Sequence, residues 1–213
     1  MKVPLSKPWI TEEEIKAVEE VLRTPNLSLG PKLPEFEGML AGVAQRKYAV
    51  AVNSGTSALH LIIHSLGVKD GDEVITTPFS FISSSNCILF ERAKPVFVDI
   101  RKDTYNINPD LIESAITGRT KAIIAVDVFG QPAEWDKLTA IAKKHHLYLI
   151  EDSAEAIGSE YKGKRAGSFG DAAIFAFYPN KQITTCEGGV IVTDNENVAL
   201  LSKSMRNQGR GEG

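Results

Sequence analysis

The stretch Ile174–Gly189, IFAFYPNKQITTCEGG, is the segment around which the rest of the chain is organised. It overlaps the apolar run Ala172–Phe177, which predicts a buried strand, and a second apolar run begins at Val190. Between the two runs lie a Tyr-Pro break and a polar segment that holds a single lysine, Lys181. A partly desolvated lysine loses its proton more easily and can form a Schiff base with a carbonyl compound. Taken alone, a solvated loop lysine is the commoner explanation, since lysines are usually exposed.

Length and composition indicate an ordinary globular protein. The chain has 213 residues, of which 43% are hydrophobic and 24% charged, enough for one large domain or one and a fraction. A net charge of −3 gives no general attraction to nucleic acid or to anionic membranes, and no apolar stretch is long enough to span a bilayer. Cys87 and Cys186 have no metal-site spacing, and the N-terminus lacks a signal core. A reduced, cytoplasmic setting is therefore expected.

Strand and helix patterns alternate along most of the chain. Two amphipathic helices are predicted first, at residues 11–23 and 33–45, within an N-terminal segment of about residues 1–46. Further helices are predicted at residues 57–66, 81–90, 109–115, 134–145 and 197–205. The alternation predicts an α/β fold in three layers, a mostly parallel sheet of about seven strands with helices on both faces. The last two strands have no helix between them and are expected to pair differently. The predicted strands are residues 48–52, 73–76, 95–98, 122–126, 148–150, 172–177 and 190–193.

Ligands of such sheets sit beyond the carboxyl ends of the strands, so the residues that follow each strand matter most. After the first strand come Gly55, Thr56 and Ser57, which open a helix. Hydroxyls and free N–H groups at a helix N-terminus suit an anion, most naturally a phosphate. An ordinary helix cap is the alternative explanation, and by itself this signal is weak.

The other strand ends add an aromatic side chain and a carboxylate. Phe79 or Phe81 follows the second strand and could cover a flat ring, although an aromatic residue there is more often part of the core. Glu151 and Asp152 follow the fifth strand directly, where a helix cap or a surface ion pair would be the commoner role. Together with Lys181, these positions form the set that pyridoxal phosphate requires: a phosphate site, a ring face, an acid for the pyridine nitrogen and a Schiff-base lysine.

Other chemistries find no support in the sequence. There is no G-x-x-x-x-G-K-[ST] phosphate loop, and no G-x-G-x-x-G opens a helix after a strand. His145 and His146 follow a predicted helix and are better explained as a solvated pair than as metal ligands. Cys186 is close to Lys181, but a bystander thiol is the simpler explanation. No metal site is predicted.

With these residues in hand, the chain resembles the DegT/DnrJ/StrS family of sugar aminotransferases, which are pyridoxal-phosphate enzymes of fold type I. The order, spacing and residue identities of several sequence blocks carry the resemblance over essentially the whole chain. These blocks are NSGTSALH (53–60), GDEVITTPFSF (71–81), EDSAEAIGSEYKGKRAGSFGDAAIFAF (151–177), NKQITTCEGG (180–189) and RNQGR (206–210).

The resemblance implies a role for each candidate residue. Lys181 would hold the cofactor as a Schiff base and later move protons, and Asp152 would pair with the pyridine nitrogen. Phe81 would stack on the ring. Glu155 stands where relatives often have His or Gln near the ring hydroxyl. The phosphate would be held by Gly55, Thr56 and Ser57.

Three further features follow from the same resemblance. The loop 27–31, with Ser28 and Gly30, is similar to the segment that approaches the sugar, often across a dimer interface. Ala176 departs from the serine that many relatives use for phosphate binding. Family members are longer, so residues 1–213 are expected to form the cofactor-binding large domain, with a small C-terminal domain absent from this chain.

The function that this resemblance implies is transamination of a nucleotide-linked keto sugar in polysaccharide or related sugar biosynthesis, with L-glutamate as the amino donor and a homodimer as the active form. Two alternatives stay open at this stage. One is another pyridoxal-phosphate reaction on the same fold, such as dehydration or desulfuration, although Lys181 favours transamination. The other is a non-catalytic regulatory relative, against which the intact Lys181 and Asp152 speak. The sequence does not name the sugar, the nucleotide or the ring position.

Overall fold

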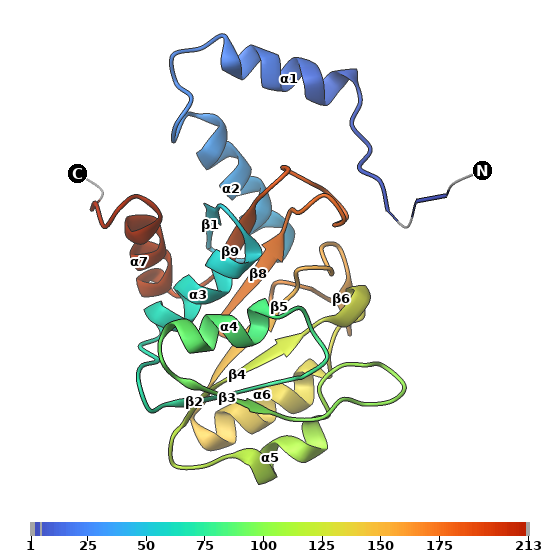
Figure 1. The fold of residues 1–213 in the computed structure, drawn as a ribbon, viewed down its shortest axis with the longest axis vertical. Coiled ribbons are helices and arrows are strands. Elements are labelled where there is room, and N and C mark those ends of the chain that lie inside the picture. The colour runs from blue at the N-terminus through green and yellow to red at the C-terminus, as the bar shows by residue number, and fades with distance from the viewer. Residues whose placement is uncertain (1–2, 5, 212–213) are drawn as a thin grey trace.

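A twisted seven-stranded sheet forms the centre of the molecule (Figure 1). The computed structural model describes residues 3–4 and 6–211. The strands lie in the order β1-β9-β8-β5-β4-β2-β3. Their bounds are β1 (Tyr48–Val52), β2 (Glu73–Thr76), β3 (Lys94–Phe97), β4 (Thr120–Val126), β5 (Tyr148–Asp152), β8 (Ala172–Ala176) and β9 (Gly189–Thr193).

Strand direction brings the chemically interesting loops together. The neighbours β3, β2, β4, β5 and β8 are parallel, whereas β9 is antiparallel to both β8 and β1. Gly189, the first residue of β9, pairs with Val52 and Ala176, the last residues of β1 and β8. The carboxyl ends of six strands and the start of the seventh therefore share one edge, and this confirms the predicted sheet with its exceptional last pair.

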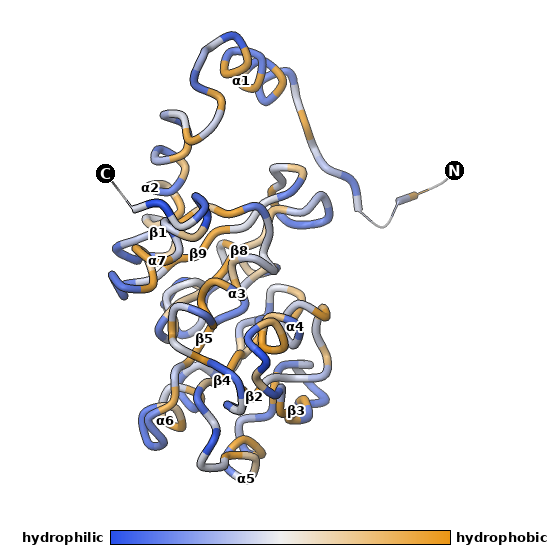
Figure 2. The backbone as a smooth tube through the Cα atoms, turned by 60° about the vertical axis from the view of Figure 1, so that its left-hand side comes forward, coloured by the Kyte–Doolittle hydropathy of each residue, from blue (hydrophilic) through white to orange (hydrophobic). Residues whose placement is uncertain are grey.

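Helices cover both faces because side chains alternate along each buried strand. Ile124 of β4 packs in a core cluster with α3, α4 and α7, while Ile123 packs on the opposite face with α6. A third cluster joins α2 to β8 and β9. In the backbone tube of Figure 2, the hydrophobic strands run through the middle of the molecule, between the helical layers. The helices of these layers are α2 (Lys32–Ala44), α3 (Gly55–Ser65), α4 (Ser83–Phe90), η1 (Pro109–Leu111), α5 (Ile112–Ala115), η2 (Val128–Gly130), α6 (Trp135–His145) and α7 (Glu196–Arg206).

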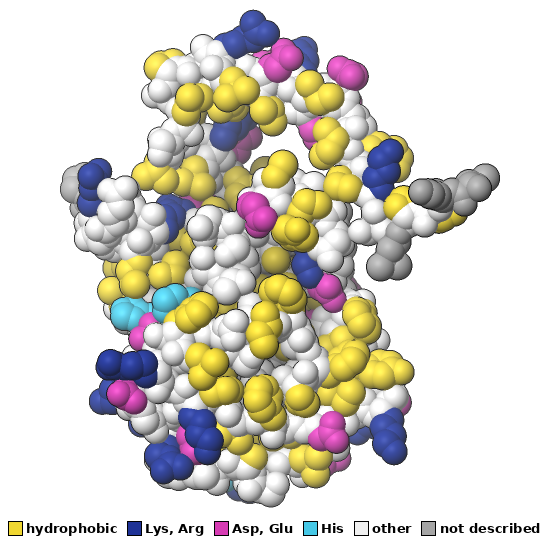
Figure 3. All heavy atoms as spheres, viewed as in Figure 1, with side chains coloured by type: hydrophobic (Ala, Val, Ile, Leu, Met, Phe, Trp, Pro, Cys, Tyr) yellow, Lys and Arg dark blue, Asp and Glu magenta, His cyan; other side chains and the backbone are white. Residues whose placement is uncertain are grey.

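Helix α1 (Glu12–Leu22) lies apart from the sheet. Thr11 caps it with a complete capping box to Glu14, and none of its residues is buried. Its apolar stripe, predicted from the sequence, is left exposed: Ile15, Val18 and Leu22 are all more than 40% accessible. Figure 3 shows hydrophobic side chains along the lower side of α1, above the hollow that separates this helix from the body.

Several element bounds differ from the predictions. Glu151 and Asp152 are the last two residues of β5 and do not follow it, because β4 and β8 continue to pair with them. Helix α4 begins at Ser83, so Phe81 lies in the preceding loop. A small hairpin of β6 (Glu160–Tyr161) and β7 (Lys164–Arg165) was not predicted, since its strands are too short and polar to give a pattern. Of the predicted N-terminal segment and C-terminal loop, residues 1–2, 5 and 212–213 lie outside the described residues.

Candidate functional site

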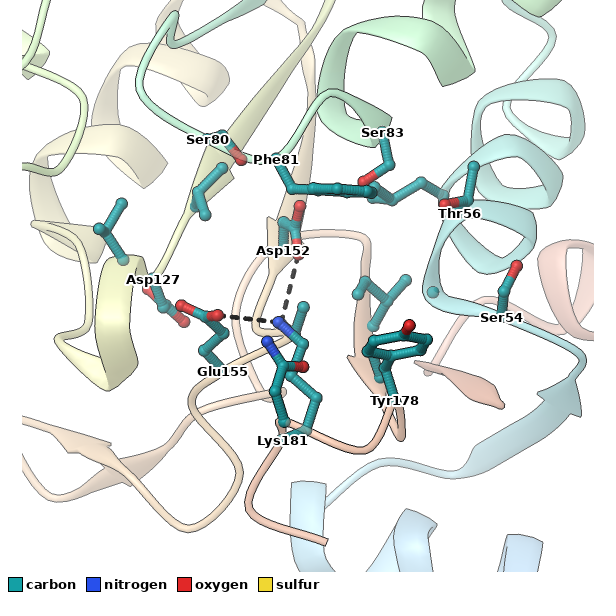
Figure 4. A pocket seen from close by; sticks show the side chains of 18 of the residues that line it. Ser54, Thr56, Ser80, Phe81, Ser83, Asp127, Asp152, Glu155, Tyr178 and Lys181 are labelled. Atoms are coloured by element: carbon teal, nitrogen blue, oxygen red, sulfur yellow. Dashed lines mark hydrogen bonds and ion pairs between the residues drawn. The ribbon is translucent and has the colours of Figure 1, made fainter. Parts of the chain in front are cut away.

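A cavity of about 640 Å³ opens at the carboxyl edge of the sheet (Figure 4). That volume is in the range of small-molecule and cofactor sites. The cavity wall comes from the ends of β2, β4, β5 and β8 and from the start of α3. Of the residues predicted from sequence, the wall contains Gly55, Thr56, Phe81, Asp152, Glu155 and Lys181. The fold therefore brings together six side chains or backbone segments that span 127 positions of sequence.

The start of α3 forms an anion cradle. Ser54 caps the helix, and its Oγ accepts from the N–H of Ser57 at 3.1 Å. First-turn N–H groups have no intrahelical partner, so those of Gly55 and Thr56 are available to an anion. A Cβ on Gly55 would lie 2.9 Å from the Cβ of Ala176, so this turn sits against β8 only because residue 55 has no side chain. Ser57 is not on the cavity wall; its hydroxyl contacts Ser54.

Asp152 presents a buried carboxyl group to the cavity. Its side chain points to the α3/α4 face of the sheet, opposite to that of Glu151, as strand alternation requires. Ser84 Oγ donates to Oδ2 at 2.9 Å, and the N–H of Ala154 donates to Oδ1 at 3.3 Å. Burial raises the pKa of Asp152, while the hydrogen bond from Ser84 and the charge of Lys181 act in the opposite direction.

Behind Asp152 lies a second acidic group, the carboxyl pair Asp127 and Glu151, bridged by Ser153. Ser153 Oγ lies 2.6 Å from Asp127 Oδ2 and 2.7 Å from Glu151 Oε1. Burial raises the pKa of Asp127 to about 6, and burial together with the charge of Asp127 raises the pKa of Glu151 well above its usual range. Two carboxyl groups so close do not both ionise easily, because the charge on one opposes ionisation of the other.

Lys181 reaches the same space from the loop that follows β8. Its Nζ lies 2.8 Å from Glu155 Oε1, and the side chain is 15% exposed. The other carboxylate oxygen of Glu155 accepts from the N–H of Phe129 at 3.2 Å. Figure 4 shows the amino group pointing toward both Glu155 and Asp152. Glu155 thus fixes the end of the lysine side chain and links it to the loop after β4.

Two aromatic rings border the cavity. Phe81 lies above Asp152 in Figure 4, on the side opposite to Lys181, and Tyr178 lies beside the lysine. Phe81 is 75% exposed and packs in no core cluster, which favours the ring-covering role over the core role considered from sequence. A flat group between Phe81 and Lys181 would meet Asp152 at its edge.

Some of the site residues predicted from the sequence lie outside the cavity. Ser28 and Gly30 lie in the loop between α1 and α2 and are not part of the cavity wall. Their neighbour Leu29 lines a separate hollow beside the C-terminal end of α7. Cys186 is exposed, has a left-handed φ of 68°, and is likewise not on the wall.

Sequence reasoning missed several wall residues. Ser80, Ser83, Asp127, Tyr178 and Asn180 line the cavity, and Ser54 caps the anion cradle. Asp127 carries a signal that was available, since it follows the predicted fourth strand directly. The serines gave none, because Ser-rich turns before helices are common.

Two negative findings concern the described part of the chain. No helix there is long and apolar enough to cross a membrane. No group of three or more His, Cys, Asp or Glu residues among the described positions is arranged to hold a metal ion.

The residues present fit pyridoxal phosphate. The helix start with its glycine cradle suits a phosphate, the buried carboxyl of Asp152 suits a protonated ring nitrogen, and Lys181 suits a carbonyl carbon. A sheet of this topology with that set at its carboxyl edge matches the fold of pyridoxal-phosphate-dependent transferases.

Comparison with known proteins identifies the family. The profile of the DegT/DnrJ/EryC1/StrS aminotransferase family matches residues 8–213, and the chain belongs to that family. The spore coat polysaccharide biosynthesis protein SpsC of Bacillus subtilis is 45% identical over 197 residues, which are 92% of this chain and 51% of SpsC.

Solved structures agree with this assignment. PseC of Helicobacter pylori, an aminotransferase of pseudoaminic acid biosynthesis, superimposes with a TM-score of 0.95 at 37% identity over 98% of this chain and 57% of PseC. The PLP form of Spr1654 of Streptococcus pneumoniae superimposes with a TM-score of 0.90 at 36% identity over 98% of this chain and 57% of Spr1654. Spr1654 is also known in a PMP form. The predictions of family, fold and pyridoxal phosphate as cofactor are thereby confirmed. The chain spans about half the length of the curated relatives that it matches.

Proposed function

We propose that this chain is the cofactor-binding part of an aminotransferase that converts a nucleotide-linked keto sugar to an amino sugar, with L-glutamate as the amino donor. The observation that carries the proposal is the convergence of Lys181, Asp152 and the α3 anion cradle on one cavity at the carboxyl edge of the sheet. The roles of SpsC in spore coat polysaccharide biosynthesis and of PseC in pseudoaminic acid biosynthesis support a sugar substrate and a role in polysaccharide or related sugar biosynthesis.

Each residue would have a defined part in binding. The N–H groups of Gly55 and Thr56 would hold the phosphate, with Ser57 supporting the turn through Ser54. Phe81 would cover one face of the ring, and Asp152 would face the ring nitrogen. Glu155 would hold the lysine side chain and border the ring hydroxyl. Bound pyridoxal phosphate supplies an electron sink for the charge left when a substrate carbon loses its proton.

The chain's own proton chemistry would centre on Lys181. Its Nζ would take the proton from the substrate carbon as general base and return it, as general acid, at a second position two bonds away. Asp152 would keep the ring nitrogen protonated, and its buried position excludes water from that contact. Glu155 stays within 2.8 Å of the lysine and would guide it between the two positions.

The wider assembly belongs to the same proposal. Residues 1–213 would form the large domain with its N-terminal helical segment of about residues 1–46, and a small C-terminal domain would complete the whole protein. A cytoplasmic homodimer with shared sites would place Ser28 and Gly30 near a sugar. Desulfuration gains no support, because Cys186 is not on the cavity wall.

The test uses the full-length protein loaded with pyridoxal phosphate. Addition of L-glutamate should change the visible absorption of the bound cofactor to that of the pyridoxamine form, and Lys181→Ala should remove the response. Nucleotide-linked keto sugars added next should yield an amino sugar, detected by mass spectrometry. A folded, cofactor-loaded protein that reacts with neither glutamate nor another amino acid would contradict the proposal.

A further inference from the structure

The buried carboxyl of Asp152 depends on a hydroxyl from another element. Asp152 is 3% exposed. The N–H of Ala154 donates to it at 3.3 Å and Ser84 Oγ donates at 2.9 Å, and the amino group of Lys181 also points toward it (Figure 4). The contact with Ala154 is local and long. Ser84, in the first turn of α4 and 68 positions away in sequence, makes the shorter one. An ionised carboxylate in such a position needs donors, because burial without them favours the neutral acid.

Ser84 does not act alone. Its Oγ lies 2.8 Å from Ser80 Oγ, and Ser80 lines the cavity. A serine hydroxyl has one proton to give, and an ionised carboxylate only accepts. If Asp152 is ionised, Ser84 must therefore donate to Asp152 and accept from Ser80. The order Ser80 to Ser84 to Asp152 is fixed, and each bond polarises the next.

We propose that Ser84, supported by Ser80, is a positioning residue that keeps Asp152 ionised and aimed at the ring-nitrogen end of the cavity. This inference rests on the proposed function, in which Asp152 meets the ring nitrogen. Ser84 touches neither cofactor nor substrate in this role and acts through the carboxylate. Its hydrogen bond is the largest of the effects that oppose the burial-induced rise in the pKa of Asp152.

The neighbouring serine provides a matched control. Ser85 is on the same helix turn and nearly as buried as Ser84, but its hydroxyl donates to the carbonyl oxygen of Ile82 at 3.0 Å. Loss of a hydroxyl from α4 is common to both alanine variants, and only Ser84→Ala removes a donor from Asp152.

The experiment follows the ring nitrogen directly. Full-length protein is loaded with pyridoxal phosphate carrying ¹⁵N in its ring, and the ¹⁵N chemical shift is measured against pH by NMR, beside the dissociation constant of the cofactor. Ser84→Ala should lower the pH at which the ring nitrogen loses its proton and weaken cofactor binding about tenfold, as expected for a lost hydrogen bond to a charged group. Ser84→Thr should restore both values, and Ser85→Ala should leave both unchanged.

Asp152→Asn separates this inference from the proposed function. A ¹⁵N profile that moves in Asp152→Asn but not in Ser84→Ala would overturn the role of Ser84 and leave the site assignment standing. A profile that moves in neither variant would overturn both. Should Ser84→Ala fail to fold, Ser80→Ala carries the test: a smaller shift in the same direction supports the hydroxyl chain, and no shift overturns it.

Discussion

The two sides of the cavity are built in different ways. On one side, Asp127, Glu151, Asp152, Ser153 and Ser84 are each 3% exposed or less and are held by strands, by α4 and by hydrogen bonds to one another. On the other, most residues of the lysine loop, 178–187, are exposed or half-buried. Lys181 is fixed there mainly through Glu155. The buried side therefore combines the electrostatics of the site with support of the fold, whereas the lysine loop is expected to contribute to the proposed chemistry and little to the stability of the fold.

The strongest test of this contrast is Lys181→Ala. On the proposed function, the variant loses the residue that would bind the cofactor covalently and move the proton, so turnover should fall by at least about 10³-fold. The melting temperature should change by no more than about 3 °C, because the partly exposed ion pair with Glu155 contributes at most about 1 kcal/mol. Steady-state kinetics and calorimetry measure the two effects.

Lys162→Ala is the control for Lys181→Ala. Lys162 also pairs with a carboxylate, Asp136 Oδ2 at 2.6 Å, but it lies in the turn of the β6–β7 hairpin and is not on the cavity wall. It should keep full turnover. A large loss of stability in Lys181→Ala alone would show that the lysine loop supports the fold after all.

Gly55→Ala tests how closely the start of α3 packs against β8 at the cavity wall. The added methyl would meet the Cβ of Ala176 at 2.9 Å, so the variant should lose about 1–3 kcal/mol of unfolding free energy and bind pyridoxal phosphate more weakly. Gly42→Ala is the matched control, because nothing lies within 4 Å of its added Cβ and alanine favours a helix interior. Urea unfolding compares them, and equal stability of the two variants would contradict the packing argument.

The Asp127 and Glu151 pair should make stability depend on pH. Their pKa values are raised on folding, so the folded state holds protons that the unfolded state releases. The stability that this pair contributes is complete below about pH 4 and is lost as pH rises toward 6 and above, by up to about 1.4 kcal/mol per pH unit for one proton. Urea unfolding at pH 4.5, 5.5 and 6.5 measures the slope.

Asp127→Asn should flatten that slope. The amide keeps an oxygen for the N–H groups of Ala133 and Trp135, which both donate to Asp127 Oδ1, and it removes one of the two competing charges. An unchanged slope in the variant would mean that other carboxyl groups set the pH dependence.

The smallest effect is expected at the junction of the two sides. Glu155→Gln keeps the shape of the side chain but removes the charge that holds Lys181, a partly exposed contact worth at most about 1 kcal/mol. Turnover should fall about fivefold, which is that free energy converted to a rate, with little change in stability. A loss as large as that of Lys181→Ala would give Glu155 a direct part in the reaction.

Much of this arrangement could be read from the sequence. Strand periodicity located all seven strands of the main sheet, and the residues that follow them pointed to Lys181, Asp152 and the Gly55 turn, because parallel strands present their carboxyl ends at one edge. The missed positions share a cause. Ser84 belongs to a serine-rich run at the start of a helix, and its contact with Asp152 joins elements that no local pattern connects.

The layered α/β fold, the family and the chemical types at the strand ends could all be inferred from the sequence, since they depend on local periodicity and on motifs with fixed spacing. Which of these groups come into contact depends on the three-dimensional packing of the chain. The order β1-β9-β8-β5-β4-β2-β3 places Asp127 beside Glu151 and puts α4 over Asp152. Ser28 and Gly30, in the loop between α1 and α2, lie outside the cavity. Long-range contacts of this kind follow from strand order and helix packing, and the free energy that selects them is spread over the whole core.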